Sequence, residues 1–268
     1  MKITDSTLIR WAGLAAVAAG VIFAGIQPIH PPDVLASVST DAWAIITPLK
    51  TVMAFLFLLG ITGIYARQAN KAGWLGLAGF FLLSLCWSIQ LAFIFAEAFI
   101  LPPLATVAPQ FVDGILAVVS GQPAEGNLGA LPALFALAGI PYMLGGLLFG
   151  IATIRAGILS RWAAGLLAVA SILTPLATLL PHATQRLAGI PVGLALAWLG
   201  YALWSERRAA AAELGSPQLR QSGAKKGRCK PYGADRWLQQ LSVPTPYQNW
   251  SQKRKDFCQR TTRYVQAD

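Results

Sequence analysis

The sequence predicts an all-α polytopic membrane protein with six transmembrane helices, arranged as three helical hairpins with both termini in the cytoplasm. Three observations carry this prediction. Of the 268 residues, 55% are hydrophobic and only 12% are charged, which is about half the charged fraction of an average soluble domain. Six apolar stretches are each long enough to cross the roughly 30 Å hydrocarbon core of a bilayer. The basic residues gather at alternate boundaries between these stretches.

Each predicted span is defined by its length and by how few charges it carries. The first, Leu8 to Gln27, is longer than the apolar region of a secretory signal peptide, so we expect it to be retained. The second and third, Ala42 to Ala66 and Gly73 to Ile100, carry one charged residue apiece, Lys50 and Glu97. Because backbone groups in lipid must pair within their own segment, we expect helices throughout. The remaining spans carry no charge: Leu131 to Ile154, Trp162 to Leu180 and Leu187 to Trp204.

The basic residues predict the orientation, because short loops rich in Lys and Arg stay in the cytoplasm. Lys2 and Arg10 precede the first span, and Arg207 and Arg208 follow the sixth. Tryptophans stand beside the cationic boundaries, where an indole keeps its ring in the membrane and its N–H at the headgroups. The membrane-interface anchors predicted in this way are Trp11, Trp74, Trp162, Trp204, Arg67, Lys71, Arg155 and Arg161.

Two segments stand apart from the six-helix bundle expected over residues 1–205. The outer loop, residues 102–130, contains an apolar stretch, Val107 to Val119, that is too short for a seventh span and has Asp113 in its middle. We expect an interfacial or re-entrant helix there. Residues 206–268 form a basic cytoplasmic tail that we expect to be disordered and to meet anionic lipid headgroups. A nucleic-acid partner is disfavoured, because no recognisable RNA-binding fold accompanies the tail.

Small residues recur at helical spacing, as in Gly13 with Gly20 and Gly189 with Gly193. They allow helix backbones to approach closely, so we expect them to pack helices together and to offer faces for homo-oligomer contacts. A cation, a tryptophan and small residues open spans one, three and five. This faint repeat suggests three related hairpins, although the same residues are common in any helix that enters from the cytoplasmic side.

The charged residues inside the spans are the best candidates for a functional site, because an ionisable group in a membrane is costly. Lys50 lies about two turns from the outer end of span two, and Glu97 lies near the outer end of span three. Gln90, seven residues before Glu97, shares its helix face. We predict a substrate-binding polar group made of Lys50, Gln90 and Glu97 in the outer half of the bundle. In the alternative interpretation, Lys50 and Glu97 reach the outer headgroups separately and serve as anchors.

Other chemistry has little support in the sequence. His30 and His182 fall at outer boundaries beside prolines and are weak candidates for metal or haem ligands, so we expect them to be surface histidines. No nucleotide-binding loop, zinc-protease motif or nucleophile with a basic partner is found. We therefore expect no cofactor and no bound metal, and a protein that is not an enzyme.

The run from Leu147 to Ile172, LLFGIATIRAGILSRWAAGLLAVASI, and the RWAGLAAVAAGVIF opening resemble uncharacterised bacterial multi-pass inner-membrane proteins known by domain-of-unknown-function labels. The resemblance covers residues 8 to 205 and implies a location in a bacterial cytoplasmic (inner) membrane, with the lipid bilayer as partner. It implies no catalytic residues. Two functions remain open: a non-catalytic protein that acts through packing or partner contacts, and a small-solute or ion transporter with the Lys50, Gln90 and Glu97 site.

Overall fold

The computed structural model describes residues 5–124, 126–177 and 185–214, and within these ranges every regular element is a helix. The predicted basic tail therefore lies almost entirely outside the described residues. The helices are α1 (Asp5–Ile26), η1 (Leu35–Ser37), α2 (Asp41–Phe99), α3 (Leu101–Val107), α4 (Pro109–Val119), α5 (Leu131–Ala156), α6 (Arg161–Leu176), η3 (Arg186–Gly189) and α8 (Ile190–Leu214).

Four helical segments are long and apolar enough to cross a membrane: Thr7–Ile26, Asp41–Phe99, Leu131–Ala156 and Arg186–Ser205. The chain is thus all-helical in its described part and has the composition of a membrane protein. The division differs from the six predicted spans at two places. The second and third predicted spans belong to one helix, α2, and the fifth corresponds to α6, which has only 16 residues.

Helix α2 is folded back on itself at Gly73. With 59 residues, a straight helix would be about 88 Å long at 1.5 Å per residue, about three times the hydrocarbon thickness. Gly73 instead has φ 58° and ψ −162°, a conformation that only glycine adopts readily. The two arms then run side by side: Tyr65 stacks on Phe80 with ring centroids 4.6 Å apart, and Phe57 lies 4.2 Å from Trp87.

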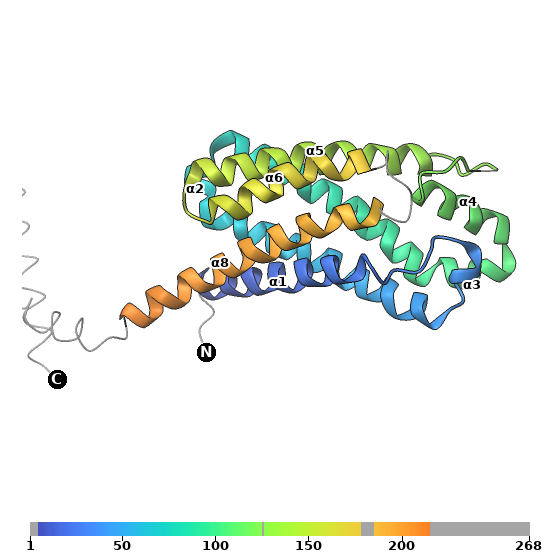
Figure 1. Cartoon of the computed structure of the whole chain (residues 1–268), viewed down its shortest axis with the longest axis horizontal. Coiled ribbons are helices and arrows are strands. Elements are labelled where there is room, and N and C mark those ends of the chain that lie inside the picture. The colour runs from blue at the N-terminus through green and yellow to red at the C-terminus, as the bar shows by residue number, and fades with distance from the viewer. Residues whose placement is uncertain (1–4, 125, 178–184, 215–268) are drawn as a thin grey trace, which may run out of the picture. The chain divides into compact units, whose positions relative to one another are not determined.

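The helical segments close into a ring in which neighbours in the sequence are neighbours in space (Figure 1). Helix α1 packs against α2, α2 against α5, α5 against α6, and α6 against α8, which returns to α1. The core along this ring is apolar and includes Ala19, Phe57, Phe149, Leu167 and Leu196, each at most 1% exposed. As a result, α1 begins and α8 ends at the same end of the bundle (Figure 1).

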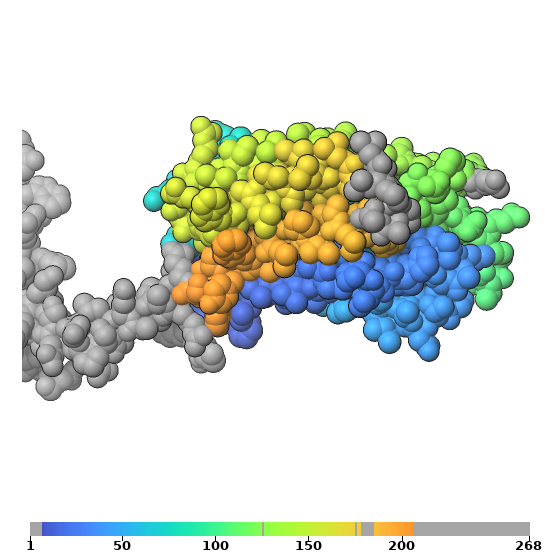
Figure 2. Space-filling view, viewed as in Figure 1, coloured from blue at the N-terminus to red at the C-terminus, as the bar shows by residue number. Residues whose placement is uncertain are grey.

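Helices α1 and α8 meet through glycines on both sides of the contact. A Cβ atom added at Gly200 would lie 2.6 Å from the backbone oxygen of Gly13 and 2.8 Å from the nitrogen of Val17. Only glycine allows this approach. Figure 2 shows the orange surface of α8 lying directly on the blue surface of α1. The predicted packing role of these small residues is therefore fulfilled within the chain, and contact between copies remains a prediction.

The outer loop forms two short helices, α3 and α4, in place of a single helix. Val112 and Leu116 of α4 pack with Leu101 against Trp43 and Val38. Helix α4 thus covers one end of the bundle, next to the start of α2 (Figure 1). Its position relative to a membrane surface remains a prediction.

The predicted anchors lie at the opposite end of the bundle, where α1 begins, α2 turns and α5 passes into α6 (Figure 1). Trp11, Trp74 and Trp162 are exposed there, as an interfacial indole requires. Lys50 and Glu97, in contrast, belong to the end covered by α4. The predicted basic anchors thus lie at one end of the bundle, and Lys50 and Glu97 lie at the other.

Candidate functional site

The open ends of the α2 hairpin bring Lys50 and Glu97 together. The first arm starts at Thr40, whose hydroxyl caps the helix by accepting a hydrogen bond from the Trp43 backbone nitrogen. The Trp43 indole nitrogen donates to the backbone oxygen of Glu97, 3.1 Å away, and Trp43 is fully buried. This bond joins the start of one arm to the end of the other and fixes the height at which Lys50 faces Glu97.

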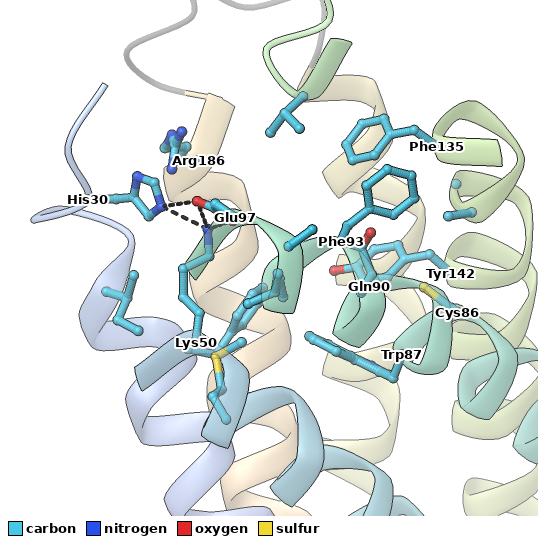
Figure 3. A pocket seen from close by; sticks show the side chains of 18 of the residues that line it. His30, Lys50, Cys86, Trp87, Gln90, Phe93, Glu97, Phe135, Tyr142 and Arg186 are labelled. Carbon is cyan, nitrogen blue, oxygen red and sulfur yellow. Dashed lines mark hydrogen bonds and ion pairs between the residues drawn. The ribbon is translucent and has the colours of Figure 1, made fainter. Parts of the chain in front are cut away.

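Lys50, Glu97 and His30 form a buried cluster of hydrogen bonds (Figure 3). The Lys50 ammonium donates to both carboxylate oxygens of Glu97, each 2.6 Å from Nζ, and lies 2.9 Å from Nε2 of His30. The side chains of Lys50, Glu97 and His30 are 15%, 10% and 2% exposed. Such short charge-assisted contacts at low exposure are stronger than neutral hydrogen bonds.

The surroundings of His30 define which ring nitrogen carries the proton. Nδ1 lies 2.6 Å from the carbonyl oxygen of Pro31, and because a carbonyl only accepts, Nδ1 must be the donor. Nε2 is then free to accept from the Lys50 ammonium. Nε2 also lies 3.6 Å from Oε1 of Glu97, so the imidazole faces both members of the ion pair.

A second ion pair lies beside the first. Arg186 Nη2 donates to Oδ2 of Asp33, whose side chain is only 3% exposed. Ligand atoms of His30, Asp33 and Glu97 all lie within 4.8 Å of one another, a spacing that would suit a metal ion. Lys50 and Arg186 already bind these acceptors, so the arrangement is a network of paired charges. A metal ion would have to displace both cations.

The cluster forms one wall of a cavity of about 400 Å³. The cavity is bounded by α1, both arms of α2, α4 and α5, with single residues from α3, α6 and η3. Phe93, Phe135 and Met53 are among its apolar lining residues. A volume of this size suits a small organic molecule.

The structure brings the three predicted site residues to one cavity but not into one cluster. Gln90 lines the cavity with Lys50 and Glu97, yet its side chain lies on the other side, near Tyr142 and Trp87 (Figure 3). No hydrogen bond joins Gln90 to Lys50 or Glu97 among the residues that the structure describes. Lys50 and Glu97 are bound to each other, whereas the anchor interpretation has each reach the headgroups alone. Whether the three residues bind a substrate remains a prediction.

The expectation that His30 is a surface histidine is wrong. Backbone bonds from Ile29 and His30 to the Ile26 oxygen continue the turn after α1 and direct the ring inward, edge-on to Trp43 with centroids 6.2 Å apart. His182 lies outside the described residues. The positions of Asp33 and Arg186 in the sequence do not indicate that they belong to the site. Asp33 lies in a loop and Arg186 begins η3, 153 positions away, so no local pattern pairs them.

The chain matches no protein-family model, no curated protein and no solved structure in comparisons with known proteins. The resemblance to bacterial inner-membrane proteins therefore stays an expectation. The assignment of a role to the site must rest on its geometry.

Proposed function

We propose that the protein binds a small organic solute in the cavity behind the Lys50, Glu97 and His30 cluster and acts as a membrane carrier for it. The observation that carries this proposal is the position of a buried ion pair in the wall of a 400 Å³ cavity. Ionisable groups within membrane helices are costly and usually face a cavity or pathway. A purely structural contact would not need a cavity of ligand size beside it.

The proposed topology is six crossings with both termini in the cytoplasm. The two arms of α2 are each longer than the roughly 20 residues that a crossing takes. Helix α6, with 16 residues, is about 24 Å long and covers most of the hydrocarbon core. The Arg and Lys boundaries at one end of the bundle favour that end as the cytoplasmic one, which would be the inner face of a bacterial cytoplasmic membrane. The cavity would then open toward the outer half.

The proposal can be tested by filling the cavity. Ala138 lines it and is 5% exposed, whereas Ala133 lies on the exposed side of the same helix. Small molecules extracted from purified wild-type protein, Ala138→Trp and Ala133→Trp would be compared by untargeted mass spectrometry. We expect a compound that co-purifies with the wild type and Ala133→Trp but is lost from Ala138→Trp.

The compound found in this way would then be used in uptake assays with proteoliposomes. We expect uptake by the wild type and its loss in Lys50→Ala and Glu97→Ala, with both variants still inserted in the membrane. Equal recovery of every compound from the two tryptophan variants would reject the binding site. That result would leave the non-catalytic role through packing or partner contacts.

A further inference from the structure

The far wall of the same cavity contains hydrogen-bond donors without acceptors. The Trp87 indole nitrogen is buried and has no hydrogen-bond partner among the described residues. The Tyr142 hydroxyl is also buried and makes no hydrogen bond within 3.5 Å in the described part of the chain, although it interacts with the side chain of Thr174. Both residues line the cavity, and Trp87 is only 3% exposed. Figure 3 shows them with Gln90 on the opposite side of the cavity from Lys50 and Glu97.

The Trp87 indole and the Tyr142 hydroxyl can each donate a hydrogen bond to a ligand atom that accepts one. An indole N–H can only donate, and a tyrosine hydroxyl needs an acceptor for its proton. Leaving a buried donor unpaired is unfavourable, so a ligand oxygen that accepts from it would gain affinity. The adjacent Gln90 amide can donate as well.

The charged residues on the other side of the cavity, Lys50 and Glu97, already bind each other and need no charged ligand as a partner. The Lys50 ammonium has three protons, and its contacts with two Glu97 oxygens and with His30 use all of them. Asp33 pairs with Arg186 through Oδ2, whereas its buried Oδ1 has no hydrogen-bond partner among the described residues, but Asp33 does not line the cavity. An anion or a cation entering the cavity would meet the paired Lys50 and Glu97, and would have to disrupt that pair or remain unpaired at high cost.

We infer that the ligand is an uncharged, mostly apolar molecule that carries a carbonyl-type oxygen, with this oxygen directed at Trp87 and Tyr142. The inference rests on the proposed function, since it specifies the ligand of the same cavity. The aromatic rings of Phe93 and Phe135, which also line the cavity, would contact the apolar part of the molecule.

Three naphthalene probes of similar shape separate the possible ligand classes. 2-Acetylnaphthalene is an uncharged ketone, 2-ethylnaphthalene lacks the oxygen, and 2-naphthoate carries a negative charge. Their binding to the full-length protein in nanodiscs would be measured by equilibrium dialysis, with protein-free nanodiscs to correct for partition into lipid. The indole nitrogens would be labelled with ¹⁵N, and the Trp87 signal would be assigned from its absence in Trp87→Phe.

We expect 2-acetylnaphthalene to bind most tightly and to shift the Trp87 indole signal. Trp87→Phe and Tyr142→Phe should each weaken its binding roughly fivefold, because each loses one hydrogen bond, and should leave the binding of 2-ethylnaphthalene unchanged. Both substitutions keep an aromatic ring, so the contacts of Trp87 with Phe57 and Phe23 are largely kept.

Two results would overturn the inference. One is equal binding of the ketone and the hydrocarbon with no shift at Trp87, and the other is preferred binding of 2-naphthoate. If Ala138→Trp still abolishes the binding of whichever probe binds, the cavity is a ligand site and only the inferred chemical class of the ligand is wrong. If Ala138→Trp leaves the binding of every probe unchanged, the proposed function fails together with the inference.

Discussion

Replacing Lys50 with methionine removes the cation that contacts the Glu97 carboxylate and leaves that carboxylate in a site where it is 10% exposed. Replacing Glu97 with glutamine leaves the Lys50 ammonium in the same position. Breaking one partner of a buried ion pair destabilises a protein by about 3–5 kcal/mol, because the remaining charge has no counter-charge. We expect each single variant to lose stability in this range.

The double variant Lys50→Met with Glu97→Gln should be less damaged than either single variant. Neither charge remains, so the expected loss is that of the hydrogen bonds, about 1–2 kcal/mol. The single losses sum to at least about 6 kcal/mol, so the coupling free energy between the two positions should be at least about 4 kcal/mol, well above the limit of about 0.5 kcal/mol that is typical of independent sites.

Reversible unfolding of the purified protein in mixed detergent micelles would measure these free energies. Thr51→Ala, Ser88→Ala and their combination provide a matched control, since each hydroxyl bonds a backbone oxygen of its own arm of α2. Their effects should add. The reasoning is refuted if the Lys50 and Glu97 substitutions also add, because the pair would then be solvated and not buried.

Three further predictions concern the scaffold that positions the cluster, each measured by the same unfolding assay. Trp43→Phe should destabilise the protein by about 1–3 kcal/mol, because it leaves the backbone oxygen at the end of α2 without its buried donor; no loss would contradict the role of this bond. Gly200→Val should lower stability by about 1–3 kcal/mol because it separates α8 from α1. The control Gly25→Ala should be neutral or stabilising by up to about 1 kcal/mol, because a Cβ atom there would meet nothing within 4 Å. Equal effects of the two substitutions would contradict the close contact between α8 and α1. Gly73→Ala should cost about 1–3 kcal/mol because of its positive φ, and wild-type stability would show that the chain does not turn there.

Much of the helical architecture is predictable from the sequence, because apolar length and charge placement are local properties. The spans predicted at Ala42 to Ala66 and Gly73 to Ile100 correspond to the two arms of α2. Their merger into one helix, with a single non-helical residue at Gly73, was not predicted, since glycine is common in both helices and turns of membrane proteins. The Gly13 and Gly20 pattern indicated close packing, but only the structure identifies α8 as the partner.

The sequence indicates which charged residues belong to the candidate site, but it does not predict how close they lie to one another. Lys50 and Glu97 are unusual for their apolar surroundings, so the sequence singles them out. Counting from the inner anchors at about 1.5 Å per residue places Glu97 some 10 Å beyond Lys50. The length of the lysine side chain and the bond between Trp43 and the Glu97 backbone close this gap. The contribution of His30 depends on a turn outside the spans, and no sequence pattern predicts where that turn directs a side chain.

The proposed function depends above all on the ion pair between Lys50 and Glu97, which is buried in the wall of the cavity. Solid-state NMR in lipid bilayers can measure it directly in protein labelled with ¹⁵N at lysine Nζ and ¹³C at glutamate Cδ. Because both Glu97 oxygens lie 2.6 Å from the Lys50 nitrogen, we expect strong nitrogen–carbon dipolar dephasing of one lysine signal that is missing in Lys50→Arg. A Lys50 signal without such dephasing would contradict the account.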